Sequence, residues 1–213
     1  MRPPEDWRRA RLTLGIAGVT AAAWFLAYGL GLSEPAAIKG GFIPFRMQGV
    51  EGDESFVPAF LTPLTATLVH GGLMHVLFNL LMLLFCGRAV ESILGSRQLA
   101  ILYVAGAYAA AAAQYAVNPQ SIDPMIGASG AISAVLGAYS IMFGRNRVKV
   151  ANPKVALWLN ALWLAAGWVA LQLIVGFTFE TSGTRIAVAA HVGGFLVGLL
   201  LAKPLLLLRY RGA

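Results

Sequence analysis

Long stretches without any charged residue divide this sequence. Asp, Glu, Lys and Arg are absent from residues 12–32, 55–87, 99–122, 124–144, 155–179 and 186–202. A helix that crosses about 30 Å of hydrocarbon needs about 20 residues, and about 17 suffice where a flanking Lys or Arg can reach back to the interface. Lys203 and the apolar residues 204–208 extend the last stretch. The pattern therefore predicts six membrane-spanning helices and an all-α fold.

The composition also indicates a protein that folds in a membrane. Apolar residues make up 58% and charged residues 12% of the 213 residues, and the mean hydropathy is +0.72. Soluble domains carry about 25% charged residues. The first apolar stretch lacks a small-x-small cleavage site, so we expect it to stay attached rather than be removed as a signal peptide. We expect residues 1–213 to form one membrane domain.

The positive charges indicate how the spans are oriented. If the N-terminus is cytoplasmic, 13 of the 16 Lys and Arg residues fall in cytoplasmic segments, and only Lys39, Arg46 and Arg185 fall outside. This asymmetry follows the positive-inside rule and places residues 1–11 and the C-terminus in the cytoplasm. The same asymmetry accounts for the net charge of +7, so this charge does not indicate that the protein binds nucleic acid. The lipid bilayer is the expected partner of this surface.

One connection is much longer than the others. About thirty residues, from 33 to about 65, join the first two spans, and loops of that length in compact folds are usually functional or disordered. Apolar residues in this segment favour an ordered loop that lies on or in the outer leaflet. These residues are Phe42, Ile43, Phe45, Phe56, Val57, Phe60 and Leu61.

Polar residues inside the predicted spans are the functional candidates, because each costs free energy in lipid and usually faces a partner or a cavity. The second span contains His70, His75 and Asn79. His75 and Asn79 are four residues apart and therefore share a helix face. Counting 1.5 Å per residue back from Arg88, the first inner charge, places both at or above mid-membrane on the outer side.

The fourth and sixth spans carry a serine and a histidine on faces of small residues. The fourth span begins with Gly127-Ala128-Ser129-Gly130, and the sixth has His191, Gly194 and Gly198 on one face. Small residues let membrane helices approach closely. We therefore expect these two spans to be neighbours, with Ser129 and His191 facing each other in the outer half of the membrane.

These motifs resemble those of the rhomboid family of intramembrane serine proteases. The matching segments are His70-Gly-Gly-Leu-Met-His75-Val-Leu-Phe-Asn79, Gly127-Ala128-Ser129-Gly130 and Ala190-His191-Val-Gly-Gly194-Phe-Leu-Val-Gly198. The resemblance implies a six-helix bundle of the basic bacterial form, in the inner membrane, that cleaves single-span membrane proteins near the outer face. It implies Ser129 as nucleophile, His191 as general base, an oxyanion hole of His75, Asn79 and Ser129, and neither a cofactor nor a metal. The supporting residues in these motifs are His70, Gly127, Gly130, Gly194 and Gly198.

The chemistry of these residue types agrees with those roles. A serine hydroxyl is a weak nucleophile until a base accepts its proton, and His191 is the only titratable residue on a face that could meet Ser129. No Asp or Glu lies in any predicted span, so the pair would be a dyad rather than a triad. Ser129 lies near the N-terminal end of its helix, where unpaired backbone N–H groups favour negative charge.

The sequence departs from the family pattern at two places. Many members carry Trp-Arg in the first outer loop, fourteen residues before the second-span histidine, where this chain has Leu61-Thr62. Many also stack a Tyr on the catalytic histidine from four residues after the serine, where this chain has Ser133. The first change bears on how the loop is anchored and the second on how the histidine is oriented. We expect Ser133, like Ser140, to be a packing residue.

The fifth span carries three tryptophans whose role the sequence leaves open. They are Trp158, Trp163 and Trp168. By the resemblance they would line a lateral entrance for substrate. By composition alone, Trp158 fits the aromatic belt at the membrane surface and the other two fit lipid contact.

Other functions explain the pattern less well. An aspartyl intramembrane protease needs two membrane carboxylates and a site-2 metalloprotease needs His-Glu-x-x-His, and the sequence has neither. A transporter or channel would explain polar residues in spans, but neither intramembrane charge nor paired broken helices are predicted. The remaining alternative is a rhomboid-like pseudoprotease that binds membrane clients. The presence of both Ser129 and His191 argues against it.

Overall fold

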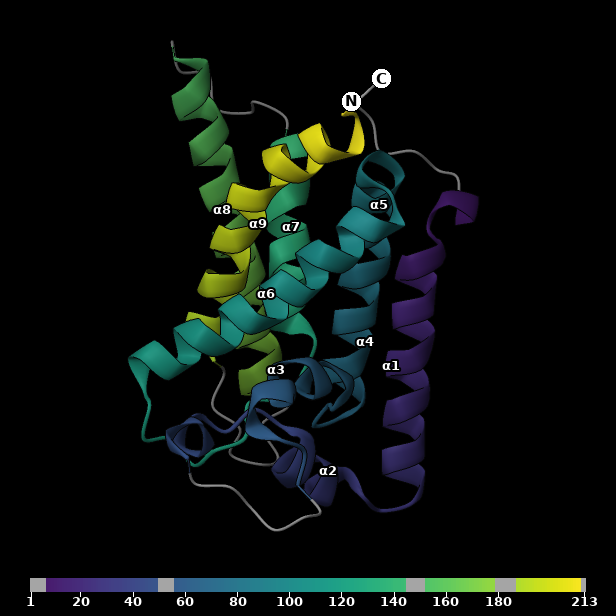
Figure 1. The fold of residues 1–213 in the computed structure, drawn as a ribbon, viewed down its shortest axis with the longest axis vertical. Helices are drawn as coiled ribbons and strands as arrows, with labels where there is room; N and C mark the ends of the chain where they lie inside the picture. The colour runs from purple at the N-terminus through teal and green to yellow at the C-terminus, as the bar shows by residue number, and fades with distance from the viewer. Residues whose placement is uncertain (1–6, 50–55, 145–151, 179–186, 212–213) are drawn as a thin grey trace.

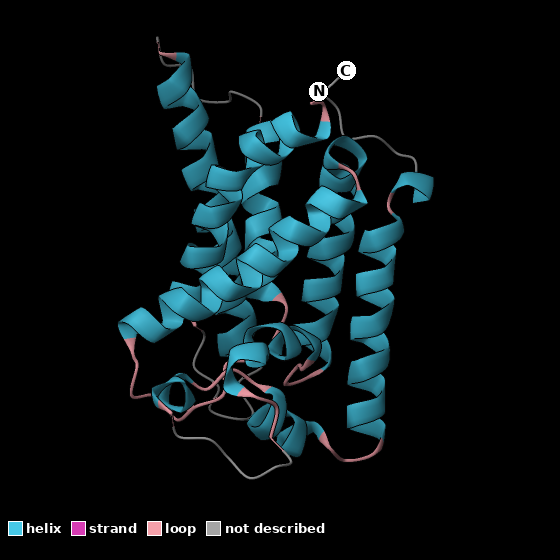
Figure 2. Ribbon diagram, in the orientation of Figure 1, coloured by secondary structure: helices cyan, strands magenta, loops and turns pink. Residues whose placement is uncertain are grey.

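The computed structural model describes residues 7–49, 56–144, 152–178 and 187–211 (Figure 1). The α-helices are α1 (Arg11–Gly29), α2 (Ser33–Gly40), α3 (Thr62–Thr65), α4 (Leu73–Met82), α5 (Arg88–Leu94), α6 (Ser96–Val117), α7 (Ser129–Phe143), α8 (Pro153–Thr178) and α9 (Val188–Arg209). The 3-10 helices are η1 (Trp7–Arg9), η2 (Pro44–Gln48), η3 (Ala59–Leu61) and η4 (Ala66–Leu68), and η5 (Leu83–Gly87) is a π-helix. Figure 2 shows the described ranges as helices joined by loops. Within these ranges, the one β contact is an isolated bridge between Phe42 and Met125.

Several predicted features fall partly or wholly outside these ranges. They are the cytoplasmic loop at 145–151, the outer connection at 179–186, residues 1–6 of the N-terminal segment and residues 50–55 of the long first loop.

Helical segments of the described chain occupy the positions of all six predicted spans. Four are long and apolar enough to cross a membrane, namely Arg11–Gly29, Leu73–Leu94, Ser96–Val117 and Val188–Arg209. The other two are α8, of 26 residues, and α7, of only 15 residues, 12 of which are buried. The protein is thus a polytopic, all-α membrane protein, in which α7 is enclosed by its neighbours rather than exposed to lipid.

Small residues hold α7 against α6 and α9. A Cβ added to Gly194 would overlap the carbonyl oxygen of Gly130, and one added to Gly198 would overlap that of Ala134. On the side of α6, a Cβ at Gly130 would lie 2.5 Å from the Cβ of Ala110. Backbones in contact at this range have no room for larger side chains. The predicted contact between the fourth and sixth spans is therefore confirmed.

The second span ends later than the sequence predicts. Its charge-free stretch ends at Gly87, whereas the helix continues through η5 and α5 to Leu94. Glu91 in α5 is buried, and its carboxylate accepts hydrogen bonds from the backbone N–H groups of Leu12 and Thr13 at 2.9 and 2.8 Å. Because these N–H groups begin α1, the carboxylate caps that helix and its charge is stabilised inside the bundle.

The long first loop is ordered in its described part and carries α2, η2, η3, α3 and η4. The Arg46 guanidinium is buried, donates a hydrogen bond to the carbonyl oxygen of Val57 at 2.8 Å, and lies 4.9 Å from the centre of the Phe56 ring. The hydroxyl of Thr62 donates to the carbonyl oxygen of Ala59 at 2.6 Å. The loop is therefore anchored from Arg46, sixteen positions before Thr62 in the sequence.

The described chain begins and ends at the same end of the bundle (Figure 1). Helix α1 begins and α9 ends there, whereas α2 and α3 lie at the opposite end (Figure 1). The hydroxyl of Tyr210, just after α9, donates to the carbonyl oxygen of Ile93 in α5 at 3.2 Å. This arrangement puts the start of the first span and the end of the last span on the same side.

Candidate active site

Ser129 and His191 form a hydrogen-bonded pair between α7 and α9. Ser129 is the first residue of α7, and His191 lies in the first turn of α9. The Ser129 Oγ and His191 Nε2 atoms are 2.8 Å apart, and the two residues are only 7% and 5% exposed. The hydroxyl donates to Nε2 when the neutral imidazole carries its proton on Nδ1. The structure thus brings together the serine and the histidine that the sequence predicts to face each other.

Among the described residues, no third polar group orients the imidazole of His191. Its Nδ1 atom is buried and has no hydrogen-bond partner among the described residues. In a Ser-His-Asp triad this nitrogen would donate to a carboxylate that fixes the ring and its tautomer. Within the described residues, Ser129 and His191 thus form a hydrogen-bonded pair without a carboxylate on Nδ1.

The backbone at Gly127 brings a second histidine close to the serine. Gly127 has φ +106°, and its N–H donates to the carbonyl oxygen of Ala66 at 2.9 Å. A Cβ added there would lie 2.6 Å from Nε2 of His75. Only glycine adopts this left-handed backbone without strain and also leaves room for the imidazole. Gly127 thus allows His75 to approach the start of α7.

His70 and His75 each accept a hydrogen bond from a backbone N–H group, one through Nε2 and the other through Nδ1. The N–H of Gly71 donates to Nδ1 of His75 at 3.4 Å, which leaves the proton of a neutral His75 on Nε2, the atom that faces Gly127. The N–H of Ala128 donates to Nε2 of His70 at 3.4 Å. The two rings meet edge to face, with centroids 4.9 Å apart. His70 therefore supports both His75 and the residue before the serine.

Asn79 is buried one helical turn below His75. It is 1% exposed, and its Nδ2 donates one hydrogen to the carbonyl oxygen of His75 at 2.8 Å. The amide nitrogen has a second hydrogen. The hydrogen bonds of the described residues do not join Asn79 to Ser129. The N–H of Ser129 itself belongs to the first turn of α7, where the helix provides no acceptor.

The structure adds a tryptophan to the site. Nε1 of Trp168 in α8 donates to the hydroxyl of Ser133 at 2.7 Å, and this hydroxyl donates to the carbonyl oxygen of Ser129 at 2.7 Å. The Trp168 and His191 rings meet edge to face at an interplanar angle of 66°, with centroids 6.3 Å apart. Trp163 on the same helix is 72% exposed and faces outward. The exposure of Trp163 therefore fits the expected lipid contact, whereas Trp168 is buried and does not fit it.

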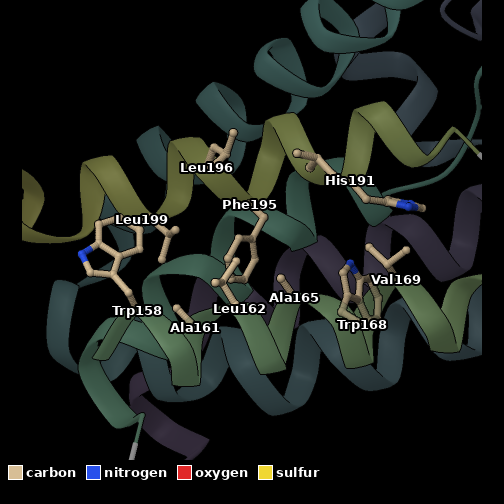
Figure 3. A pocket seen from close by; sticks show the side chains of 11 residues that line it. Trp158, Ala161, Leu162, Ala165, Trp168, Val169, His191, Phe195, Leu196 and Leu199 are labelled. Carbon is tan, nitrogen blue, oxygen red and sulfur yellow. The ribbon is translucent and has the colours of Figure 1, made fainter. Parts of the chain in front are cut away.

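An apolar cavity of about 170 Å³ lies between α8 and α9 beside this group. Figure 3 shows Trp168 and His191 at one end of it, and Trp158 with Leu199 at the other. Ser129 does not line it. Helices α8 and α9 are therefore incompletely packed beside His191, and Trp168 lines the same cavity as the imidazole.

Comparison with known proteins identifies the family. The family model of the Rhomboid domain matches residues 59–208, which include Ser129, His191, His75 and Asn79. The chain belongs to the rhomboid family. The family is the one that the three sequence motifs resemble.

Three similar proteins come from a plant and two bacteria. The chain is similar to RHOMBOID-like protein 5 of Arabidopsis thaliana, 31% identical over 139 residues that make up 65% of this chain and 42% of the relative. It is similar to rhomboid protease GluP of Bacillus subtilis, 32% identical over 142 residues, 67% of this chain and 25% of the relative. It is similar to rhomboid protease GlpG of Pectobacterium atrosepticum, 32% identical over 135 residues, 63% of this chain and 45% of the relative. The matches thus span less than half of the length of these relatives.

Proposed function

We propose that this rhomboid-family protein is an intramembrane serine endopeptidase that uses Ser129 as nucleophile and His191 as general base. The observation that carries the proposal is the 2.8 Å contact between Ser129 Oγ and His191 Nε2, both buried, in a membrane bundle. Relatives named rhomboid proteases support the same reaction class. The whole proposed site lies within the matched Rhomboid domain.

The reaction follows from the atoms around the pair. Ser129 Oγ attacks the carbonyl carbon of the scissile peptide bond while His191 Nε2 accepts its proton. The oxygen of the tetrahedral intermediate carries a negative charge, and the Nε2–H of His75, an N–H of Asn79 and the backbone N–H of Ser129 stabilise it. His191 then gives its proton to the leaving amine. Water, deprotonated by the same imidazole, finally hydrolyses the acyl group from Ser129.

The physics of the bilayer limits which peptide bonds of a membrane protein can be cut. A helix in hydrocarbon keeps its backbone groups bonded to each other, so its peptide bonds are not accessible to a nucleophile until the helix unwinds. Gly and Pro make unwinding easier, and an end of the helix near the membrane surface frays first. The family resemblance implies single-span membrane proteins as substrates, and this physics favours those with helix-breaking residues near the outer face.

A reconstitution assay tests this proposal. The full chain in liposomes is expected to cut a single-span model substrate once, close to the outer end of its span, and the Ser129→Ala variant is expected to leave it intact. Cleavage by folded Ser129→Ala protein would contradict the assigned nucleophile. Substrate that binds to the wild-type protein and stays whole would instead favour a pseudoprotease that binds membrane clients.

We further propose that both termini are cytoplasmic and that the protein lies in the inner membrane of a bacterium. The uneven distribution of Lys and Arg supports this orientation, as does the common end at which α1 begins and α9 ends. In a bacterial host, a reporter that is active only outside the cytoplasm is expected to be active after Pro119 and silent after Ser96. Activity after Ser96 would show that the orientation is inverted.

A further inference from the structure

The proposed reaction requires a fixed imidazole, yet the described hydrogen bonds do not fix that of His191. Its Nε2 contacts the reacting hydroxyl and its Nδ1 has no partner among the described residues. Cavity space also adjoins the ring on the side of α8. Without a neighbour that fills this side, rotation about the side-chain bonds would move Nε2 away from Ser129. A misplacement of about 1 Å can lower a rate about 100-fold.

Trp168 is the neighbour that occupies this side. It is 3% exposed, and its ring meets that of His191 edge to face. Figure 3 shows the indole of Trp168 reaching from α8 toward His191 on α9. Aromatic rings in this arrangement attract each other, and a bulky ring also excludes other positions of its neighbour by contact.

The indole is itself held by a hydrogen bond. Its Nε1–H donates to the Ser133 hydroxyl at 2.7 Å, and that hydroxyl donates to the carbonyl oxygen of Ser129 at 2.7 Å. Ser133 and Ser129 are on consecutive turns of α7, and all three residues are buried. A buried indole N–H without an acceptor would be costly, so this bond favours one orientation of the ring.

We propose that Trp168 is a positioning residue for His191, held in place by Ser133, a role that rests on the proposed function of the Ser129 and His191 pair. The chain of contacts runs from the backbone of the nucleophile through Ser133 and Trp168 to the imidazole. It thereby fixes the base relative to the nucleophile in place of a carboxylate on Nδ1. The described contacts of Trp168 in the site are with Ser133 and the His191 ring, so in this proposal it acts through His191.

Four variants separate this role from general packing. Trp168→Leu removes the ring, Trp168→Phe keeps a ring and removes its hydrogen bond, and Ser133→Ala removes the acceptor. Trp163→Leu on the exposed face of the same helix is the matched control. Each is assayed for kcat and KM with a single-span substrate, for the rate at which a fluorophosphonate labels Ser129, and for the midpoint of thermal unfolding.

Trp168→Leu is expected to lower kcat and the labelling rate together by roughly 10- to 100-fold, with KM unchanged. Trp168→Phe and Ser133→Ala should each give a smaller loss, and the double variant should be no worse than Ser133→Ala, because both changes remove the hydrogen bond between Trp168 and Ser133. Trp163→Leu should behave as wild type. If Trp168→Leu does not fold, Trp168→Phe and Ser133→Ala still decide the matter.

Two results would overturn the proposal. One is a kcat and a labelling rate at the wild-type level in folded Trp168→Leu protein. If that variant does not fold, the same result in both Trp168→Phe and Ser133→Ala overturns the proposal. The other is losses of rate that only follow losses of thermal stability, which a merely structural tryptophan would give. Wild-type protein that is not labelled at Ser129 would instead overturn the proposed function itself, so the two failures can be told apart.

Discussion

Replacing Ser129 or His191 with alanine is expected to lower turnover by at least about 10⁴-fold, and replacing both should cost no more than replacing one. The reason is that the nucleophile and the base act as one unit. A serine without a base is a weak nucleophile, and a base without the serine has nothing to activate. The measurement is kcat on a single-span substrate in liposomes for the two single variants and the double variant.

Ser140→Ala is the matched control for this experiment. Ser140 is also buried in α7, where its hydroxyl donates to the carbonyl oxygen of Gly137 at 2.7 Å. Its loss removes a buried serine hydroxyl without touching the site, so turnover should stay at the wild-type level. Multiplicative losses in the double variant would mean that Ser129 and His191 contribute independently, which a dyad does not allow.

Asn79→Ala is expected to lower kcat by about 10²- to 10³-fold and to leave KM almost unchanged. An N–H of its amide would stabilise the oxyanion, which exists in the transition state and not in the bound substrate. The loss corresponds to about 2.7 to 4 kcal/mol of activation free energy. Steady-state kinetics in liposomes measures both constants.

Asn160 provides a close control for the local role of Asn79. It is also a buried asparagine within a span, and its Nδ2 donates to the carbonyl oxygen of Ala156 at 2.8 Å, the same bond that Asn79 makes to His75. Asn160→Ala therefore removes the equivalent intrahelical bond outside the site. Equal losses of kcat in Asn79→Ala and Asn160→Ala would show that Asn79 acts only through packing, and would contradict its assignment to the oxyanion hole.

The sequence predicts well those features that depend on local pattern. A stretch of about 20 residues without charge indicates a membrane span directly, because each charge in hydrocarbon costs free energy. Glycines at helical spacing, such as Gly194 and Gly198, mark a face that another backbone approaches. With these two signals, the neighbouring fourth and sixth spans and the facing of Ser129 and His191 follow from the sequence.

Features that depend on contacts between distant segments were not predictable in this way. In the sequence, Arg88 ends the charge-free stretch and Glu91 follows it, but the N–H groups that begin α1 stabilise the carboxylate of Glu91 inside the bundle. Trp168 gives no local signal, because an aromatic residue in an apolar span is as compatible with lipid as with a site. Only the serine at position 133, where many family members have a ring, indicates that another segment has to supply one.

The measurement that tests the central proposal most directly is covalent labelling of purified protein by a fluorophosphonate, with the labelled residue identified by mass spectrometry. The probe reacts with a serine whose proton is taken by a base. Wild-type protein should carry one label, at Ser129, and labelling should fall on acidification, because an imidazolium cannot accept the serine proton. Folded His191→Ala protein should carry none. A label at Ser129 of folded His191→Ala protein, formed at the wild-type rate, would contradict the assignment of His191 as the base.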